Sequence, residues 1–260
     1  MIDIQMKSSA PLTKQTITSI NNLKVQTPLD SKHITNINTH HNSNTISRYD
    51  NNTSQHQKNE IQTTKPVETI RIQTLPPMLH TTKKGQKTQL FPESSVIKLK
   101  ACLGWNVSNP ECDVDVSAFM LSSTGKVPGD DWFVFYGQTT SPDGSLLFKP
   151  DEKIDRESIT IDLAKLDPMV SKVVFVLTIN EAYEKNLNFS MIRDAYIRIL
   201  NCSNNSELVS FKMDEYYSNV TSMMIGEIYK LNGNWKFNAI GNGVARNLAG
   251  LCELYGVQVI

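Results

Sequence analysis

Hydrophobic and polar residues alternate with period two in several short stretches of the last two thirds of the chain. Residues 96–103, 114–121 and 158–163 show this alternation, which is typical of strands with one buried face. Residues 172–179 are almost continuously apolar, as expected of a strand that is buried on both faces. Further strands are expected over residues 132–136, 195–200, 207–213, 223–230 and 235–240.

Turn residues separate these stretches. Pro142-Asp143-Gly144 and Asn232-Gly233 supply residues that tolerate a positive φ, so each predicts a tight turn. A short helix is expected over residues 181–188. A second helix is expected at the C-terminus, ending at Gly256, because five apolar positions there follow a helical spacing: Val244, Leu248, Leu251, Cys252 and Tyr255.

Many short strands with few helices predict a mainly β protein, a two-sheet antiparallel β-sandwich with short helices and a C-terminal helix. Residues 1–82 have a different composition. They are rich in Thr, Asn and Gln and contain one aromatic residue, Tyr49. Such a segment buries too little apolar surface to offset an ordering entropy of about 1–2 kcal/mol per residue. We therefore predict a disordered tail over residues 1–82 and a folded domain over residues 83–260.

The formal net charge of zero hides two oppositely charged parts. Residues 1–92 hold 11 Lys and Arg against 5 Asp and Glu, whereas residues 93–260 hold 15 against 21. The positive charges of the tail are dispersed, and no aromatic residues lie between them for base stacking. The tail is therefore expected to be a solvated linker, without specific nucleic-acid binding.

Several classes of protein are excluded or disfavoured. No run of about 20 apolar residues is present, so no transmembrane segment is expected. Residues 1–7 lack the apolar core of a secretory signal, which predicts a cytoplasmic protein. The four cysteines form no C-x-x-C pair and are expected to be reduced, mostly buried thiols.

Enzymatic activity is not expected. Residues 93–260 contain no His, which removes Ser-His-Asp, Cys-His and His-ligated zinc catalysis from the folded part. No phosphate-loop or dinucleotide-binding glycine pattern occurs. Gly241-Asn242-Gly243 is a lone Gly-x-Gly ahead of the predicted helix, and it leaves open an anion or nucleotide site at that helix N-terminus.

The acidic residues carry the strongest chemical signal. Asp113, Asp115 and Ser117 share one face of a predicted strand, with about 7 Å between neighbours on that face. Like charges at this spacing repel unless a cation bridges them. A second acidic group follows along the chain, consisting of Asp143, Asp151, Asp155 and Glu157.

Carboxylate and hydroxyl oxygens are hard ligands, and many of them on a flexible loop favour Ca²⁺. Each acidic element also has a structural explanation. The strand acids can guard a sheet edge against aggregation, Asp143 can shape its turn, and residues 151–157 can form a solvated loop. The two clusters together predict a calcium site.

The motifs around these acids resemble the TerD family of tellurium-resistance and general stress proteins. Asp113-Val114-Asp115-Val116-Ser117-Ala118-Phe119 is similar to the family's Asp-Leu-Asp-Ala-Ser-Ala-Phe, and Leu103-Gly104-Trp105-Asn106 to its Leu-Gly-Trp-Asp. The resemblance runs from residue 84 to the C-terminus. It also rests on Phe133–Tyr136, Ser141–Ser145, Ile225–Tyr229, Trp235–Phe237 and Leu254–Val257.

The resemblance implies a two-sheet sandwich that binds Ca²⁺ through its acids and a role in resistance to tellurite and other stresses. It also adds Glu181 as a candidate ligand, because Asn180-Glu181-Ala182 stands where the family has His-Asp-Ala. The family's Gly-rich acidic loop is replaced here by residues 148–157, a shorter loop with Lys and Arg and no Gly. One calcium position is therefore expected to be weakened or lost.

The leading hypothesis is a non-enzymatic Ca²⁺-binding stress module that docks onto other stress or tellurite-resistance proteins. The expected location is cytoplasmic, with peripheral attachment to a complex at the inner face of the membrane as an extension of this hypothesis. The alternatives are a metal-free protein-interaction scaffold and a cyclic-nucleotide or anion-binding protein.

Overall fold

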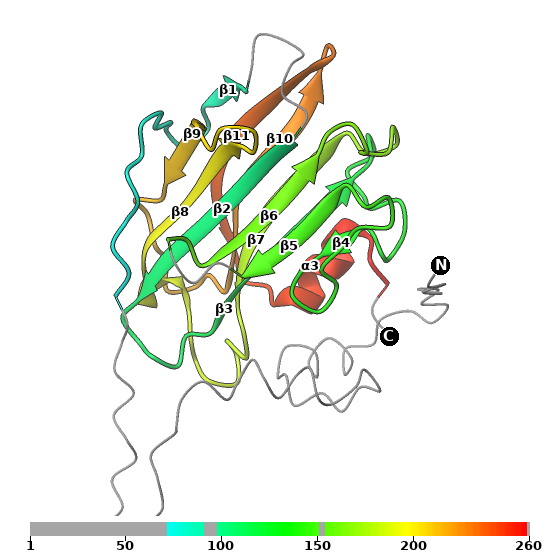
Figure 1. Cartoon of the computed structure of the whole chain (residues 1–260). Helices are drawn as coiled ribbons and strands as arrows, with labels where there is room; N and C mark the ends of the chain where they lie inside the picture. Colours follow the sequence, from blue (N-terminus) through cyan, green and yellow to red (C-terminus); the bar gives the residue numbers. More distant parts are fainter. Residues whose placement is uncertain (1–71, 91–97, 151–153, 259–260) are drawn as a thin grey trace, which may run out of the picture. The chain divides into compact units, whose positions relative to one another are not determined.

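A computed structural model describes residues 72–90, 98–150 and 154–258, and it folds the described part into two antiparallel sheets packed face to face (Figure 1). The predicted mainly β sandwich is confirmed. The six-stranded sheet has the order β1-β11-β10-β7-β3-β4, and the five-stranded sheet has the order β5-β6-β2-β8-β9. The strands are β1 Lys87–Gln89, β2 Lys98–Val107, β3 Val114–Leu121, β4 Phe133–Val134, β5 Leu146–Pro150, β6 Glu157–Asp162, β7 Lys172–Ile179, β8 Ile192–Asn201, β9 Glu207–Lys212, β10 Ser222–Leu231 and β11 Asn234–Val244.

Strand β3 shows how the alternating pattern divides the two faces. Val114, Val116, Ala118 and Met120 lie in the core between the sheets. Residues Phe119 and Leu121 of the same strand belong to a second cluster, which the C-terminal helix α3 (Leu248–Tyr255) covers on the outer side. Asp115 and Ser117 therefore share the outer face with Phe119, as the alternation predicted.

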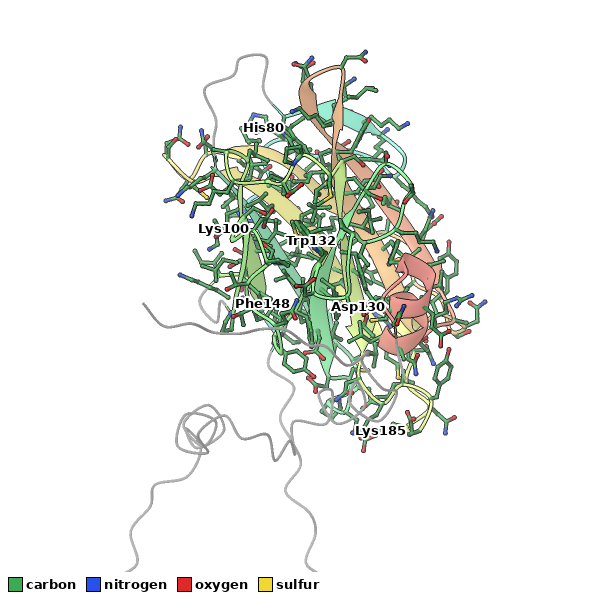
Figure 2. The ribbon with its side chains drawn as sticks, turned by 90° about the vertical axis from the view of Figure 1, so that its right-hand side faces the viewer. His80, Lys100, Asp130, Trp132, Phe148 and Lys185 are labelled. Atoms are coloured by element: carbon green, nitrogen blue, oxygen red, sulfur yellow. The ribbon has the colours of Figure 1, made fainter. Side chains whose placement is uncertain are left out.

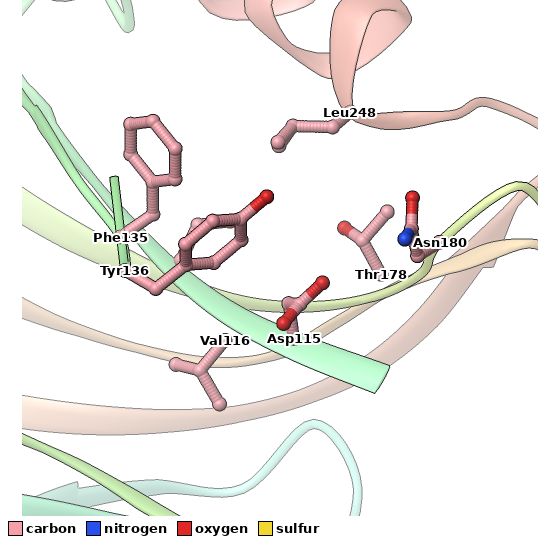
Figure 3. Close-up of a pocket in the computed structure, with 8 residues that line it drawn as sticks. Asp115, Val116, Phe135, Tyr136, Thr178, Asn180 and Leu248 are labelled. Carbon is pink, nitrogen blue, oxygen red and sulfur yellow. The ribbon is translucent and has the colours of Figure 1, made fainter. Parts of the chain in front are cut away.

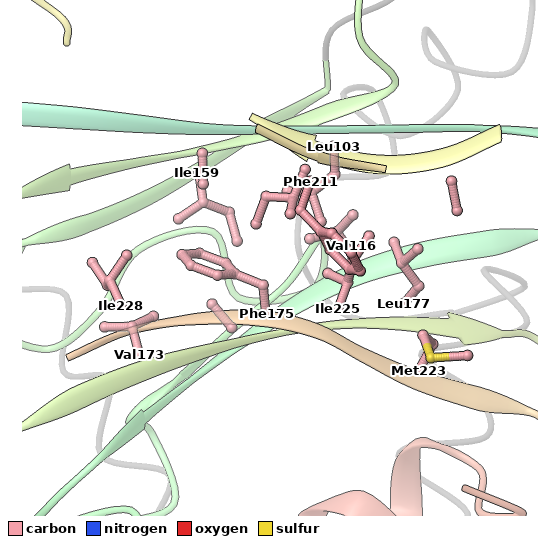
Figure 4. Packing of buried hydrophobic residues seen from close by; sticks show 14 of the residues in the cluster. Leu103, Val116, Ile159, Val173, Phe175, Leu177, Phe211, Met223, Ile225 and Ile228 are labelled. Carbon is pink, nitrogen blue, oxygen red and sulfur yellow. The ribbon is translucent and has the colours of Figure 1, made fainter. Parts of the chain in front are cut away.

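The main core lies between the sheets (Figure 4). Phe175 and Ile225 from the six-stranded sheet pack toward Leu103, Ile159 and Phe211 from the five-stranded sheet. Every one of these side chains is almost fully buried. The apolar stretch 172–179 forms β7 at the predicted bounds and lies between β10 and β3.

The turn predictions are confirmed at both hairpins. Asn232 has φ 51° and Gly233 has φ 79°, the pair of positive values that a two-residue turn between β10 and β11 requires. In the turn that precedes β5, Gly144 has φ 65°, and its N–H donates to Ser141 O at 2.9 Å. The C-terminal helix ends at Gly256, also as predicted, with φ 87°.

The short helix predicted over residues 181–188 is wrong. This segment is a series of turns, because Glu181 and Asn186 adopt positive φ values of 49° and 54°, which interrupt a helix. Ala182 and Leu187 are buried and hold the loop against the core. A single 3₁₀ turn, η1 (Phe189–Met191), follows before β8.

The helix context predicted for Gly241–Gly243 is also wrong. These residues belong to β11, and so does Val244, which was expected to begin the helix. Helix α3 starts four residues later, and the Asn247 side chain caps it by accepting a hydrogen bond from the Gly250 amide at 3.0 Å. A Cβ at position 243 would lie 2.5 Å from Val220, so close packing explains this glycine.

Residues 73–82, which we call the N-terminal strap, contact the five-stranded sheet. Thr82 N–H donates to Ser210 O at 2.8 Å, and Gln73 N–H donates to the Asn106 side chain at 2.8 Å. Contacts with the sandwich therefore begin about ten residues before the predicted domain boundary. The predicted disorder of residues 1–71 lies outside the described residues.

Candidate functional site

The acids of β3 lie beside a small pocket between the six-stranded sheet and helix α3 (Figure 3). Asp115 and Ser117 line it from β3, and Thr178 lies opposite Asp115 on the neighbouring strand β7. The Tyr136 ring and Leu248 lie on the other sides. The remaining lining residues are Val116, Phe135 and Asn180.

Glu157 reaches this region from the other sheet. It lies on β6 with the same alternation as Ile159 and Ile161, which point into the core. Its Oε2 accepts a hydrogen bond from the Val116 amide of β3 at 2.7 Å. One carboxylate of the five-stranded sheet thus contacts the backbone of the strand that carries Asp115.

Asp113 completes the acidic group at the exposed start of β3. The Asn180 N–H donates to the Asp113 carbonyl at 2.8 Å, which ties the end of β7 to this position. We call Asp113, Asp115 and Glu157, together with the hydroxyl of Ser117, the acidic site. The 181–188 loop that follows Asn180 carries Lys185, which lies toward the opposite end of the molecule from His80 (Figure 2).

Burial and neighbouring charges both raise the pKa of two carboxyl groups in the acidic site. The pKa of Asp115 is raised well above its usual value by burial, then by the charges of Asp113 and Glu157. Burial also raises the pKa of Glu157, to about 8, although the Val116 hydrogen bond opposes the rise; the charge of Asp113 adds to it. The pKa of Tyr136 rises for the same reasons, burial first and then the three carboxylates. A bound cation would relieve this repulsion.

Ser117 supplies a second observation. Its side chain is 2% exposed, and its Oγ has no hydrogen-bond partner among the described residues. A buried hydroxyl of this kind needs a partner such as an ion or a water molecule. The donor chemistry, all oxygen, fits a hard cation such as Ca²⁺. Within the described residues, however, no three His, Cys, Asp or Glu side chains are close enough to hold a metal ion.

Asp143 lies away from the acidic site. In the β5–β6 hairpin, Leu146 pairs with Ile161 and Pro150 pairs with Glu157, so Asp143 lies beyond the opposite end of the hairpin. Its Oδ1 accepts bonds from the Ser141 hydroxyl and from Ser145, and its Oδ2 accepts from the Asp167 amide. Burial acts to raise the pKa of Asp143, but these hydrogen bonds outweigh burial and lower it. Its contacts are those of a turn-shaping residue.

Asp155 forms a buried ion pair. Arg198 of β8 donates to both carboxylate oxygens, at 3.0 and 2.9 Å, and the Tyr196 hydroxyl donates to Oδ1 at 2.8 Å. The Asp155 residue is 2% exposed. Gly104 makes room for this arrangement, because a Cβ there would lie 2.4 Å from the Tyr196 ring. Asp155 is therefore neutralised by the chain's own arginine.

Glu181 forms a salt bridge with a lysine of its own loop. Lys185 Nζ lies 2.7 Å from Glu181 Oε2. Asp151 lies outside the described residues. Of the eight predicted ligands, the structure therefore places Asp113, Asp115, Ser117 and Glu157 in one region, without the close spacing of a three-residue metal cluster among the described residues, and it gives Asp143, Asp155 and Glu181 other partners.

The pocket includes four residues that were not among the predicted ligands: Thr178, Asn180, Tyr136 and Leu248. Thr178 and Asn180 could have been found, since they end the buried strand 172–179. Tyr136 and Leu248 could not, because only the packing of α3 against the sheet brings them to β3. The thiols match the expectation of reduced cysteines: all four are free, and Cys102, Cys112 and Cys252 are buried.

A two-sheet antiparallel sandwich with an acidic strand face beneath a C-terminal helix defines the class of this protein. The family model described as the TerD domain matches residues 78–255. The chain therefore belongs to the TerD family. It is 39% identical to tellurium resistance protein TerD of Serratia marcescens over 164 residues, which cover 60% of this chain and 85% of that protein.

Two further comparisons found similar proteins. It is 33% identical to general stress protein 16U of Bacillus subtilis over 186 residues, which cover 68% of this chain and 96% of that protein. A solved structure of a homologue of telluride resistance protein (TerD) from Streptomyces coelicolor is 16% identical, with a TM-score of 0.46, and covers 60% of this chain and 95% of that one. Among the described residues, no helix is long and apolar enough to cross a membrane.

Proposed function

We propose that this TerD-family chain is a non-enzymatic stress-response protein that binds Ca²⁺ at the acidic site and docks onto partner proteins in its ion-bound form. The observation that carries the proposal is the gathering of Asp113, Asp115 and Glu157 beside the unpartnered Ser117 hydroxyl, where burial first and the neighbouring carboxylate charges second raise the pKa of Asp115 and Glu157. Holding these carboxylates together costs stability that a divalent cation would restore.

The charge of the site limits how it can contribute to tellurite resistance. Tellurite is an oxyanion, and a cluster of carboxylates repels it. The buried thiols of Cys102 and Cys252 are poor reductants for it, because burial raises the pKa of each to about 12. We therefore propose an indirect role, in which the domain docks onto other stress or tellurium-resistance proteins at the cytoplasmic side of the membrane. The names of the relatives support a role in tellurium resistance or the stress response.

Thermal unfolding of the full chain tests calcium binding. In excess EGTA we expect a lower melting temperature than in millimolar Ca²⁺, with a smaller effect of Mg²⁺. An ion at about 100 times its Kd adds roughly 2.7 kcal/mol, which corresponds to roughly 5–10 °C for a domain of this size. Asp115→Asn should abolish the calcium-dependent rise.

Glu227→Gln is the matched control. Glu227 lies on β10 of the same sheet and is neutralised by Lys172 at 2.9 Å, so its replacement should leave the calcium response intact. A melting temperature that ignores Ca²⁺ in the wild-type chain would contradict the proposal. The metal-free interaction scaffold would then be favoured, and the absence of a closed three-residue metal cluster among the described residues supports that second candidate.

A further inference from the structure

The N-terminal strap is bound to the five-stranded sheet mainly through its main chain, and the Gln73 side chain adds a hydrogen bond from its Nε2 to Ile154 O at 2.5 Å. The Asn106 side chain accepts from Gln73 N–H at 2.8 Å and donates to Gln73 O at 3.0 Å. Glu207 Oε1 accepts from the amides of Leu79 and His80, at 2.9 and 2.7 Å. The sheet therefore recognises an extended backbone rather than particular side chains.

Strand β9 adds the pairing of a sheet edge. Ser210 N–H donates to His80 O at 2.9 Å, and Thr82 N–H donates to Ser210 O at 2.8 Å, with Thr81 in a parallel bridge to Ser210. Figure 1 shows the strap running beside β8 and β9. Without the strap, these groups of β9 would form an open edge, the kind of surface that accepts an added strand.

Apart from Gln73, the side chains of the strap contribute little to its binding. Leu79 is 74% exposed, and Ile72, next to the strap, is 77% exposed. Pro76 is buried, and the Pro76-Pro77 pair keeps the middle of the strap extended. Where the strap meets the sheet, three buried oxygens have no hydrogen-bond partner among the described residues: Thr82 Oγ1 of the strap, and Glu207 Oε2 and Ser210 Oγ of β9. Few apolar contacts and unsatisfied polar atoms are features of a segment that opens locally.

A short turn joins the strap to β1. Gln86 N–H donates to Lys83 O at 2.9 Å, and Gly85 between them has φ 80°. Opening this turn would carry the strap away from its own β9 while β1 stays paired with β11. A short hinge of this kind, next to a self-complementary segment, favours exchange between identical chains.

We propose that the surface formed by Asn106, Glu207 and the β9 edge is a docking site for an extended segment, and that a second copy of this chain can occupy it with its own strap. Every copy carries the backbone groups of residues 73–82 at the spacing that the site requires. The product is a two-fold symmetric, strand-exchanged dimer in which each sandwich is completed by its partner. This proposal does not depend on calcium.

The Gly85→Ala variant of the full chain tests the hinge, in EGTA. A Cβ at Gly85 meets nothing within 4 Å, so the only effect is the strain of Ala at positive φ, which shifts the turn toward its open form about tenfold. Gly233→Ala is the matched control, because Gly233 has φ 79° and equally open surroundings but lies in the β10–β11 hairpin. Light scattering after size exclusion should show more dimer for Gly85→Ala only.

A second variant tests the docking site itself. Adding Glu207→Ala to Gly85→Ala removes the acceptor of two strap amides and should abolish the extra dimer, whereas Glu207→Gln, which keeps an acceptor oxygen, should retain it. Hydrogen exchange should show the strap amides opening at least tenfold faster than those of β2 and β8. Equal dimer content in the two glycine variants, or a Gly85→Ala dimer that survives Glu207→Ala, would overturn the proposal.

Discussion

Replacing Arg198 with Ala is expected to destabilise the folded chain by about 3–5 kcal/mol, because it leaves the Asp155 carboxylate buried without its countercharge. Asp155 is 2% exposed, and Arg198 supplies contacts at 2.9–3.3 Å to its two oxygens. Of the remaining contacts, the Tyr196 hydroxyl is a single neutral donor. Urea unfolding at neutral pH measures the change in the free energy of unfolding.

The double variant Asp155→Asn/Arg198→Met separates the energetic cost of losing the ion pair from the cost of leaving one buried charge without a partner. It removes both charges at similar volume, so it should recover most of the stability that Arg198→Ala loses. The same measurement decides whether Asp155 is a calcium ligand. Equal losses in EGTA and in Ca²⁺ are expected from a purely structural ion pair, and a loss of about 1 kcal/mol or less would show that the pair is not buried as described.

The Glu157→Gln variant is expected to weaken the pH dependence of stability at the acidic site, because it removes one of the two carboxyl groups whose pKa is raised. Between about pH 4.5 and pH 8 the folded chain retains a proton on Glu157 that the unfolded chain has released. The free energy of unfolding therefore falls as the pH rises through this window, by an amount on the order of 5 kcal/mol. Gln cannot ionise but still accepts the Val116 hydrogen bond, so the variant should be more stable than the wild type at pH 8 in EGTA.

Thermal unfolding from pH 2.5 to pH 8.5, in EGTA, measures this slope, and Asp143→Asn is a control of opposite sign. The pKa of Asp143 is lowered from 3.8, so its contribution is present above that unfolded value and is lost as the pH falls below it. A Glu157→Gln variant with the same slope as the wild type between pH 5 and 8 would contradict the coupling of the acidic site. Adding Ca²⁺ should flatten the wild-type slope but not that of the variant.

Local patterns were sufficient to predict much of the fold. Strands β3 and β7 have the predicted bounds because alternation and continuous apolarity depend only on neighbouring residues. The shared face of Asp115 and Ser117 follows from the same period. Gly256 and Asn232-Gly233 were predictable because their backbone angles suit few other residues.

The remaining features depend on contacts between distant parts of the chain. Residues 181–188 have helical composition, but the burial of Ala182 and Leu187 after β7 bends them into turns. Arg198 lies 43 residues from Asp155, and Glu157 reaches Val116 from another sheet. Asp155 and Glu157 are only two positions apart, so their spacing in the sequence could not show that one pairs with Arg198 and the other contacts Val116.

Position 106 shows how a departure from the family pattern gains a structural explanation. Asn106 stands where the family has Asp, and its side chain both donates to and accepts from the Gln73 backbone. An aspartate could not donate. The substitution thus suits the N-terminal strap, which the composition of residues 1–82 placed in the tail.

Direct measurement of calcium binding to the full chain tests the central claim most directly. Equilibrium dialysis against radioactive Ca²⁺ at pH 7.5 should show saturable binding to the wild type and to Glu227→Gln. Binding should be lost in Asp115→Asn and weakened in Glu157→Gln, because these carboxylates share the acidic site. No binding by the wild-type chain, or binding that Asp115→Asn leaves unchanged, would contradict the account.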